Sequence, residues 1–243
     1  LLTLMPGCEK LGIGYVGKEV CLQCHNGVQA PDKSEFTTSY HSELQCENCH
    51  GPGALHVRNG GRYGLFVEGS TIARNRCDRC HGGEVNQFQK SGHAQKAVLD
   101  CTGCHDPHSA DTTRRTTNDN QLCLQCHTYR GFNTEEAIKG HTFHGYDPVV
   151  TGQSRCIACH MVPLQRRDQA KGPHQHSLKS APPITSNTGT DRPALPNSCA
   201  GITGCHDGSV STAPVFNVDD PQGNERLQIL FNMRYGASNT KNS

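Results

Sequence analysis

Cys46-Glu47-Asn48-Cys49-His50 is one of six stretches of this chain that share the pattern Cys-x-x-Cys-His. The six copies cover residues 21–25, 46–50, 77–81, 101–105, 123–127 and 156–160. Their starting points lie 22 to 33 residues apart, which divides the chain into a string of short units. A unit of this length does not bury a core by itself, so something other than side-chain packing is expected to organise the fold.

The composition indicates what that organiser is. Only 33% of the 243 residues are hydrophobic, 5% are aromatic and none is tryptophan, so a conventional apolar core is not expected. The chain instead holds 15 cysteines, 15 histidines, 26 glycines and 13 prolines. This mix is typical of short loops that are tied together by a cofactor or by cross-links.

Cys-x-x-Cys-His is the attachment sequence of c-type haem. Two thiols on a tight turn reach the two vinyl groups at one edge of the porphyrin, and the histidine that follows lies beneath the iron. Structural zinc also uses Cys-x-x-Cys pairs but needs no histidine directly after each pair. A disulfide framework gives no reason to keep a two-residue gap six times. The predicted attachment residues are Cys21, Cys24, Cys46, Cys49, Cys77, Cys80, Cys101, Cys104, Cys123, Cys126, Cys156 and Cys159, and the predicted iron ligands are His25, His50, His81, His105, His127 and His160.

A seventh site follows a looser pattern. In Cys199-Ala-Gly-Ile-Thr-Gly-Cys205-His206 five residues separate the two cysteines. Cys205 and His206 keep the half of the motif that places a histidine under the iron, so we predict a seventh haem attached to Cys199 and Cys205 and ligated by His206. The alternative is a disulfide between Cys199 and Cys205 that closes a small loop.

The remaining histidines suffice to close every iron site. Outside the seven motifs eight are left: His41, His56, His93, His108, His141, His144, His174 and His176. Seven haems with two histidines each use seven of them. His56 and His108 follow their motifs too closely to reach the far face of their own haem, so they are expected to cap neighbours. His174 and His176 are expected near the sixth and seventh haems. Histidine on both sides of the iron favours low potentials.

We expect a mostly irregular, elongated protein with short α-helices, organised around stacked covalent haems, with little or no β-structure. Helices are predicted over Glu84–Lys96, Thr134–His141 and Glu225–Met233, and the proline-rich stretch 165–197 is expected to be irregular. The predicted divisions are an N-terminal segment over 1–20, a multihaem electron-transfer domain over 21–206 and a haem-free docking tail over 207–243.

The N-terminus and the charge bear on location and partners. No run of 18 or more apolar residues is present, so no transmembrane span is predicted. Residues 1–8 resemble the end of a secretory signal with Cys8 as a lipidated residue, and the alternative is an ordinary unpaired cysteine. Seven ferric haems with their propionates would shift the net charge from +1 to about −6, which disfavours nucleic acid as a partner.

Four stretches resemble a known group of proteins: Phe36-x-x-Ser39-x-His41, Cys46-x-x-Cys49-His50-Gly51-Pro52-Gly53-x-x-His56, Ser91-x-His93 and Cys101-x-x-Cys104-His105-Asp106-Pro107-His108-Ser109. Over about 21–127 the chain resembles multihaem electron-transfer cytochromes related to cytochrome c-554 and to decahaem conduit cytochromes with doubled motifs. In that group a histidine near a motif is commonly a distal ligand, which the resemblance implies for His41, His56, His93 and His108. Haem number and the C-terminal half differ from that group. In architecture the chain is also similar to extracellular cytochrome nanowire subunits.

Electron transfer is therefore the predicted function, and the partners are other redox proteins or copies of this chain. We favour a subunit of an extracellular or cell-surface filament in anaerobic or extracellular respiration. The alternatives are a discrete periplasmic or surface lipoprotein shuttle and a haem subunit of a membrane respiratory complex. A reductase of nitrogen or sulfur oxyanions would need a haem with an open axial position. No Cys-x-x-Cys-Lys variant is present, so an enzyme is disfavoured.

Overall fold

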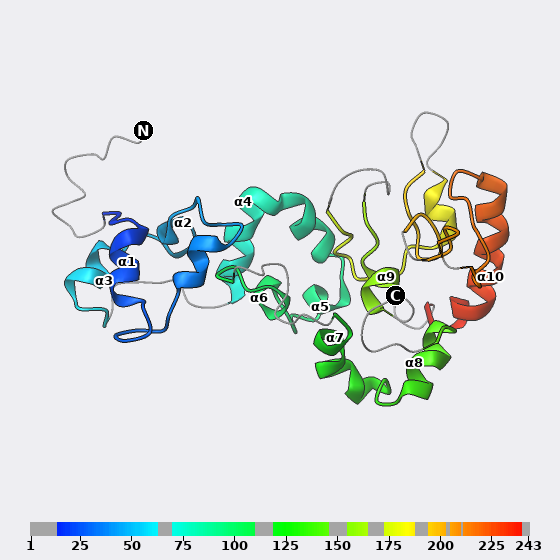
Figure 1. The fold of residues 1–243 in the computed structure, drawn as a ribbon, viewed down its shortest axis with the longest axis horizontal. Coiled ribbons are helices and arrows are strands. Elements are labelled where there is room, and N and C mark those ends of the chain that lie inside the picture. The colour runs from blue at the N-terminus through cyan, green and yellow to red at the C-terminus, as the bar shows by residue number, and fades with distance from the viewer. Residues whose placement is uncertain are drawn as a thin grey trace. The chain divides into compact units, whose positions relative to one another are not determined.

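The computed structural model describes residues 14–62, 70–109, 119–145, 155–164, 173–187, 194–202, 205–209 and 211–239. The chain forms two compact units, of which the first comprises Leu1–His81 and Leu99–Arg115 and the second Gly82–Val98 and Thr116–Ser243. Figure 1 shows their short helices and irregular connections. Among the described residues no strand is present, and only an isolated bridge joins Pro163 to His174.

Most of the helices are short. Those of the first unit are α1 (Lys18–Cys24), the 3-10 helix η2 (Ser34–Thr38), α2 (Cys46–His50), α3 (Ala54–Arg58) and α6 (Cys101–Cys104). Helix α4 (Ser70–Phe88) belongs to both units and is kinked at His81, whose φ of −111° and ψ of 36° are not helical. The remaining elements are α5 (Gly92–Gln95), α7 (Asp119–His127), η3 (Thr128–Arg130), α8 (Glu135–Thr142), α9 (Cys156–His160), η4 (Pro183–Ser186) and α10 (Pro221–Asn239). Within the described residues no helix combines the length and apolar character that crossing a bilayer requires.

Polar caps explain where several of these helices begin. The Asp100 side chain accepts hydrogen bonds from the backbone N–H groups of Thr102 and Gly103 at the start of α6. The Thr134 side chain does the same for Ala137 at the start of α8. Because a helix of one or two turns leaves most of its terminal N–H groups without helical partners, such caps contribute much of its local stability.

A buried carboxylate joins the helices of the first unit. Glu47 on α2 is 2% exposed, and its carboxylate accepts hydrogen bonds from the backbone N–H groups of Val16, Gly17 and Gly53 at 2.6 to 3.1 Å. These contacts tie the residues before α1 and α3 to α2. The chain approaches so closely here that a Cβ on Gly53 would lie 3.1 Å from Oε1 of Glu47.

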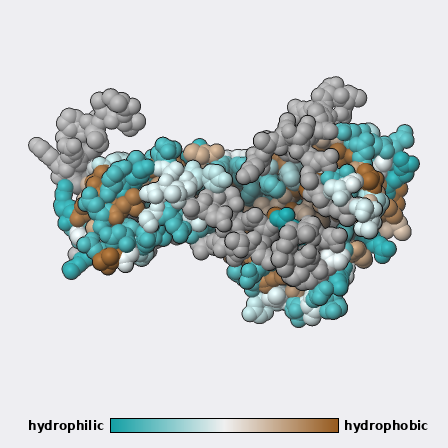
Figure 2. All heavy atoms as spheres, viewed as in Figure 1, coloured by the Kyte–Doolittle hydropathy of each residue, from teal (hydrophilic) through white to brown (hydrophobic). Residues whose placement is uncertain are grey.

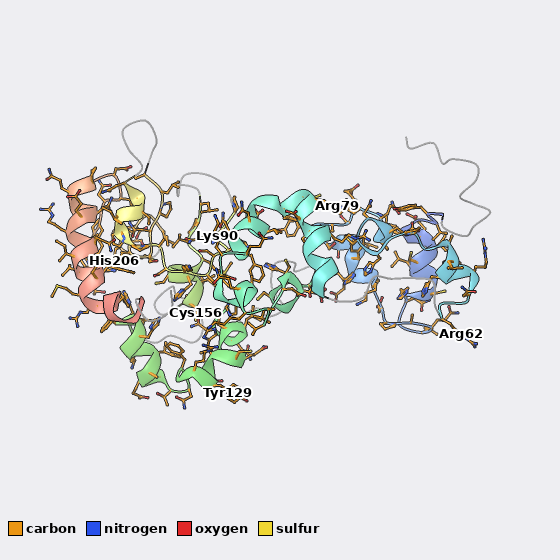
Figure 3. All side chains as sticks on the ribbon, turned by 180° about the vertical axis from the view of Figure 1, so that it is seen from behind. Arg62, Arg79, Lys90, Tyr129, Cys156 and His206 are labelled. Carbon is orange, nitrogen blue, oxygen red and sulfur yellow. The ribbon has the colours of Figure 1, made fainter. Side chains whose placement is uncertain are left out.

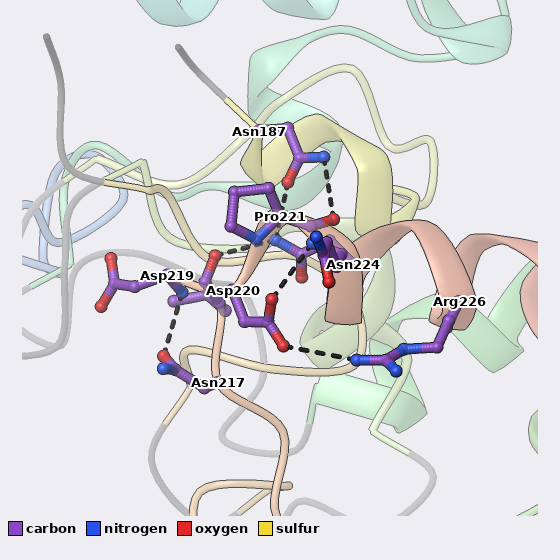
Figure 4. A network of polar contacts seen from close by, with 9 residues as sticks. Asn187, Asn217, Asp219, Asp220, Pro221, Asn224 and Arg226 are labelled. Atoms are coloured by element: carbon purple, nitrogen blue, oxygen red, sulfur yellow. Dashed lines mark hydrogen bonds and ion pairs between the residues drawn. The ribbon is translucent and has the colours of Figure 1, made fainter. Parts of the chain in front are cut away.

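In the second unit α7 packs against α9, and α10 packs against η4. The contact at the start of α10 is polar (Figure 4). Asn224, which is 1% exposed, donates hydrogen bonds from its amide to the side-chain oxygen of Asn187 and to the carbonyl of Val218, both at 2.8 Å. Near it Arg226 forms an exposed ion pair with Asp220 at 3.7 Å.

Buried hydrophobic side chains are few. Within the described residues they are Phe36, Val85, Phe88, Ile138, Val162, Ala181, Ala194, Ala200 and Phe231. The largest fully buried side chains include Asn197 and Asn224, which are polar. In Figure 2 hydrophobic residues form small separate groups on a largely hydrophilic surface. The chain thus supplies little apolar mass of its own, as its composition predicts.

The predicted fold class of short helices with irregular connections and little β-structure is confirmed. The helix predicted over Thr134–His141 is α8, and the helix predicted over Glu225–Met233 is the longer α10. The single helix predicted over Glu84–Lys96 is wrong, because Ser91 interrupts it. The Ser91 side chain accepts a hydrogen bond from the Ala94 N–H and starts the separate helix α5. Cys8 and its predicted lipid anchor lie outside the described residues.

Candidate haem sites

The motif cysteines lie on short helices that bring both thiols of a motif to one turn. Helices α1, α2, α6 and α9 are little longer than the Cys-x-x-Cys pair that each carries. The longer helices α4 and α7 also carry one pair each. Figure 3 shows Cys156 on α9. No disulfide joins any of the fourteen cysteines of the six strict motifs and the looser seventh pattern, Cys199 and Cys205 included, within the described part of the chain. Within the described residues no group of three or more Cys, His, Asp or Glu side chains is gathered to hold a metal ion, as a zinc site would need.

Six motif histidines each face a histidine from outside the motifs. The distances between ring centroids fall between 5.8 and 6.5 Å. The pairs are His25–His56 (6.5 Å), His41–His81 (6.1 Å), His50–His108 (5.8 Å), His93–His127 (5.8 Å), His141–His160 (6.1 Å) and His144–His206 (6.0 Å). A metal ion held between two imidazole nitrogens, each about 2 Å away, separates the ring centroids by about 6 Å. The paired histidines therefore fit an iron ion with two axial imidazoles.

In five of the paired histidines a backbone carbonyl near Nδ1 determines which ring nitrogen is available to bind a metal ion. Nδ1 of His206 lies 2.8 Å from the carbonyl of Pro214, and Nδ1 of His160 lies 3.1 Å from that of Leu178. Because a carbonyl only accepts, Nδ1 must carry the proton, and the lone pair is then on Nε2. The same arrangement holds for His25 with Pro31, His41 with Pro107 and His144 with Thr142. A second contact of this kind is the usual way to orient a histidine ligand.

Burial favours the neutral form of six of the paired imidazoles. Removal from water is the largest cause that lowers the pKa of His50, His93, His108, His127, His141 and His160 below the ordinary imidazole value. At His108 the carboxylate of Asp106, 3.5 Å away, acts in the opposite direction and does not reverse the shift. A neutral imidazole is the form that binds a metal ion.

Thiols of consecutive motifs meet inside each unit. In the first unit the Cys21 thiol lies within hydrogen-bonding reach of the Cys46 thiol, and Cys77 lies likewise beside Cys101. Burial is the first cause that raises the pKa of Cys21, to about 12, and Cys46 adds to it. Helix α1 also packs directly on α2. Motifs one and two, and motifs three and four, therefore adjoin at their first cysteines.

The second unit repeats this arrangement. Cys123 and Cys156 lie within hydrogen-bonding reach, as α7 and α9 pack together. The half-buried Cys159 lies close to Cys199 and Cys205, and its removal from water, followed by these two thiols, raises its pKa to about 12. Motif five thus adjoins motif six, and motif six adjoins the irregular seventh motif.

The pairs connect motifs that are distant in sequence. His56 faces the first motif and His108 the second, so both lie opposite a motif other than the one they follow. His41, which precedes the second motif, faces the third. His93 faces the fifth motif. In the first unit, therefore, no paired histidine serves the motif nearest to it in sequence.

His174 and His176 do not lie opposite His160 and His206, the histidines of the sixth and seventh motifs. Those positions are taken by His141 and His144. Nδ1 of the exposed His174 lies 2.7 Å from the carbonyl of Met161, and the His176 N–H donates to the side chain of Gln87. Both residues lie on the irregular stretch after the sixth motif, and His174 adjoins that motif through Met161, but the ring that lies opposite His160 is that of His141.

Aromatic residues near the paired histidines were missed by the sequence reasoning. Phe132 lies 5.0 Å from His141 between ring centroids, and Tyr235 of α10 lies 6.3 Å from it. Phe216 stacks on His206 at 4.6 Å. No motif surrounds these residues, so only their rarity in a chain with 5% aromatic residues would have drawn attention to them.

Comparisons with known families match two parts of the chain. Residues 93–131 match the family described as "Doubled CXXCH motif", and residues 10–51 match "Cytochrome c554 and c-prime". Residues 10–51 contain the first two motifs, and residues 93–131 contain His93 and His127, whose rings face each other.

Similar proteins are themselves polyhaem cytochromes. The chain is 26% identical to the C-type polyheme cytochrome OmcC of Geobacter sulfurreducens, over 85% of this chain and 32% of that protein. It is 28% identical to the multiheme cytochrome MtrA of Shewanella baltica, over 59% of this chain and 45% of that protein. The chain thus spans less than half the length of these relatives. No solved structure gives a significant match. With its repeated motifs on short helices and its histidines paired at the spacing of iron ligands, this chain is a multihaem c-type cytochrome that binds haem covalently.

Proposed function

We propose that this protein carries electrons along a row of six to seven closely spaced haems, each held by two histidines. The observation that carries the proposal is the set of six histidine pairs with centroids 5.8 to 6.5 Å apart. Bound haem c supplies a reversible one-electron Fe(III)/Fe(II) couple at each site.

The paired imidazoles determine what the sites do. An iron ion held by both imidazoles of a pair would have no axial position left for a substrate or water. The ligand set is also the same in both oxidation states, which keeps the rearrangement during electron transfer small. Both features support a carrier over a reductase, which needs an open position with polar groups above it.

Contacts between motifs support close spacing inside each unit. Cys21 with Cys46 and Cys77 with Cys101 bring attachment points together in the first unit. Cys123 with Cys156 does so in the second unit. Since each thiol marks one edge of its porphyrin, adjoining thiols place the edges of consecutive cofactors side by side. We propose that the haems of each unit follow the order of their motifs in the sequence.

We also propose the seventh site. Cys199 and Cys205 lie near the sixth motif, and His206 faces His144 with ring centroids 6.0 Å apart. These two observations support a seventh haem despite the five-residue spacer. Intact-mass spectrometry tests this site, since seven haems are expected and a Cys199→Ser, Cys205→Ser double variant should carry one fewer.

The cellular setting is a further part of the proposal. We favour a place outside the cytoplasm, as a subunit of an extracellular filament, over a periplasmic or surface shuttle. The exposed His174 supports this, because the carbonyl of Met161 lies 2.7 Å from its Nδ1, which leaves the lone pair on Nε2 to bind a metal ion of another subunit. Electron microscopy of haem-staining material sheared from the source cells tests it. Filaments a few nanometres wide are expected, whereas discrete particles would favour the shuttle.

Binding of carbon monoxide and nitrite tests the electron-carrier function itself. The reduced protein should bind almost no carbon monoxide and the oxidised protein no nitrite within minutes, because both axial positions are taken. Fast stoichiometric binding of nitrite at one haem, followed by its reduction, would instead establish a reductase.

A further inference from the structure

Two aromatic side chains from different parts of the second unit enclose the ring of His141. Phe132, just after η3, meets it with a centroid distance of 5.0 Å and an angle of 71° between the planes. Tyr235, near the end of α10, meets it at 6.3 Å and the same angle of 71°. Both are edge-to-face contacts, the arrangement that aromatic rings favour. Rotation of the His141 ring about its Cβ–Cγ bond would break one or both of them.

Tyr235 is itself firmly held. Its hydroxyl donates a hydrogen bond to the carbonyl of Thr142 at 3.2 Å, next to His141 in the chain. Its ring packs against Phe231 at 5.0 Å and Phe143 at 5.5 Å, and Phe231 is buried. Burial raises the pKa of Tyr235, so the phenol keeps its proton at neutral pH. Tyr235 therefore connects α10 to the end of α8.

Phe132 is fixed from the other side. Gly131 adopts a φ of 101°, which a residue with a side chain rarely takes, and this turn directs the chain back so that the Phe132 N–H donates to the carbonyl of His127. The Phe132 ring lies 6.4 Å from the His127 ring. One phenylalanine thus contacts the motif histidine of site five and the second histidine of site six.

The result is a ligand pair with nearly parallel planes. The rings of His141 and His160 differ by 9°. Other pairs show that parallel planes are not the default, because His93 and His127 are inclined by 77° and His41 and His81 by 89°. Something local must therefore set the orientation at each site, and at His141 the two aromatic contacts are the groups placed to do so.

We propose that Phe132 and Tyr235 are positioning residues that hold the His141 imidazole nearly parallel to that of His160. The inference rests on the proposed iron between these two histidines. It gives the haem-free C-terminal helix a role inside the protein, since α10 reaches the sixth site through Tyr235.

Ligand orientation has a direct spectroscopic signature. Parallel imidazoles donate into the same iron d orbital and split it from its partner, which gives a rhombic low-spin ferric signal. Perpendicular imidazoles leave the two orbitals nearly equal in energy and give a signal of much larger anisotropy. The pairs His25–His56 and His50–His108, at 19° and 17°, should contribute rhombic signals beside site six.

The test is electron paramagnetic resonance of the full-length, haem-loaded ferric protein, with spin quantitation and a haem count by mass. Tyr235→Ala and Phe132→Ala should each shift or broaden the part of the rhombic signal that one haem contributes. The double variant should remove the contribution of that one haem. Tyr235→Leu keeps apolar volume without a planar ring and should act like Tyr235→Ala. Tyr235→Phe keeps the ring and should change little. Met233→Ala, at a side chain that is 76% exposed on the same helix, is the control and should change nothing.

The outcomes separate this inference from the proposed function. A full haem count with an unaltered rhombic signal in Tyr235→Ala, Tyr235→Leu and the double variant would overturn the positioning role and leave the ligand pair intact. A high-spin signal or a missing haem in the unmodified protein would overturn the proposed site itself. His141→Ala should produce one high-spin haem, and its absence would also remove the iron from this pair.

Discussion

The imidazoles of His50 and His108 lie with their centroids 5.8 Å apart and their planes inclined by 17°. His50 ends the second motif, whereas His108 follows the fourth, so the site at His50 is complete only when two distant stretches of the first unit meet. His41, whose Nδ1 lies 3.4 Å from the carbonyl of Pro107, connects the same stretches a second time. The first unit is therefore interlocked through the histidines that we propose as iron ligands.

Replacement of His108 should open one site. His108→Ala removes the second imidazole from the iron at His50, so one haem should become high-spin and bind carbon monoxide in the reduced state. Absorption and resonance Raman spectra of the purified protein measure both effects. Val28→Ala, at an 88% exposed position of the same unit, should leave every haem low-spin. An entirely low-spin His108→Ala protein would contradict the pairing.

The buried carboxylate of Glu47 should matter for stability. Glu47→Gln turns an amide N–H₂ or a weaker oxygen toward the N–H groups of Val16, Gly17 and Gly53, and a cost of about 3 kcal/mol in the free energy of unfolding is expected. Loss of a buried negative charge should also raise the reduction potential of a nearby haem. Urea unfolding and a redox titration measure the two effects. Glu43→Gln makes the same charge change at an exposed position and should alter neither by a comparable amount.

Two glycines offer a matched test of packing. A Cβ on Gly53 would lie 3.1 Å from Glu47 and 3.2 Å from Val16, whereas a Cβ on Gly140, inside α8, would meet nothing within 4 Å. Gly53→Ala should therefore lower the midpoint of unfolding, by an amount equivalent to about 1–3 kcal/mol. Gly140→Ala should raise it through helix propensity, by up to about 1 kcal/mol. Equal effects of the two substitutions would contradict the close approach at Gly53.

The start of α10 provides a link between stability and the sixth site. Asn224→Ala removes both hydrogen bonds of the buried amide to Asn187 and Val218 and should cost about 2 kcal/mol. Hydrogen exchange in α10 should accelerate, and the rhombic signal of site six should broaden because Tyr235 loses its support. Arg226→Ala breaks only an exposed ion pair and should cost less than about 1 kcal/mol. Unchanged exchange in α10 after Asn224→Ala would show that other contacts hold the helix.

The sequence predicted the local features of this protein and missed most of the distant ones. The repeated motif predicts the attachment thiols and the first histidine of each site, which stay predictions, and Thr134 marks the beginning of α8 because a cap acts over three residues. The partner of His41 was not predictable. Closing the loop of about 40 residues to the third motif costs only about 1.3 kcal/mol more than closing the loop of about 9 residues to the second, and packing can offset this difference.

The aromatic contacts at His141 show the same limit. Phe132 and Tyr235 belong to no motif and lie far apart in the chain, so only the packing of α10 against η4 and its extension toward α8 bring Tyr235 to this histidine. The predicted helix over Glu225–Met233 was shorter than α10 for a similar reason. The first residues of α10 are held in place by the hydrogen bonds of the buried Asn224, and no helical pattern in the sequence marks them.

Near-infrared magnetic circular dichroism of the ferric protein, with haem quantified on the same sample, tests the central claim most directly. The charge-transfer band of low-spin iron reports the identity of both axial ligands. The account predicts a band at the position of two histidines, with the intensity of every haem that the protein carries. A band of histidine–methionine ligation, or an intensity short by one or more haems together with high-spin features, would contradict it.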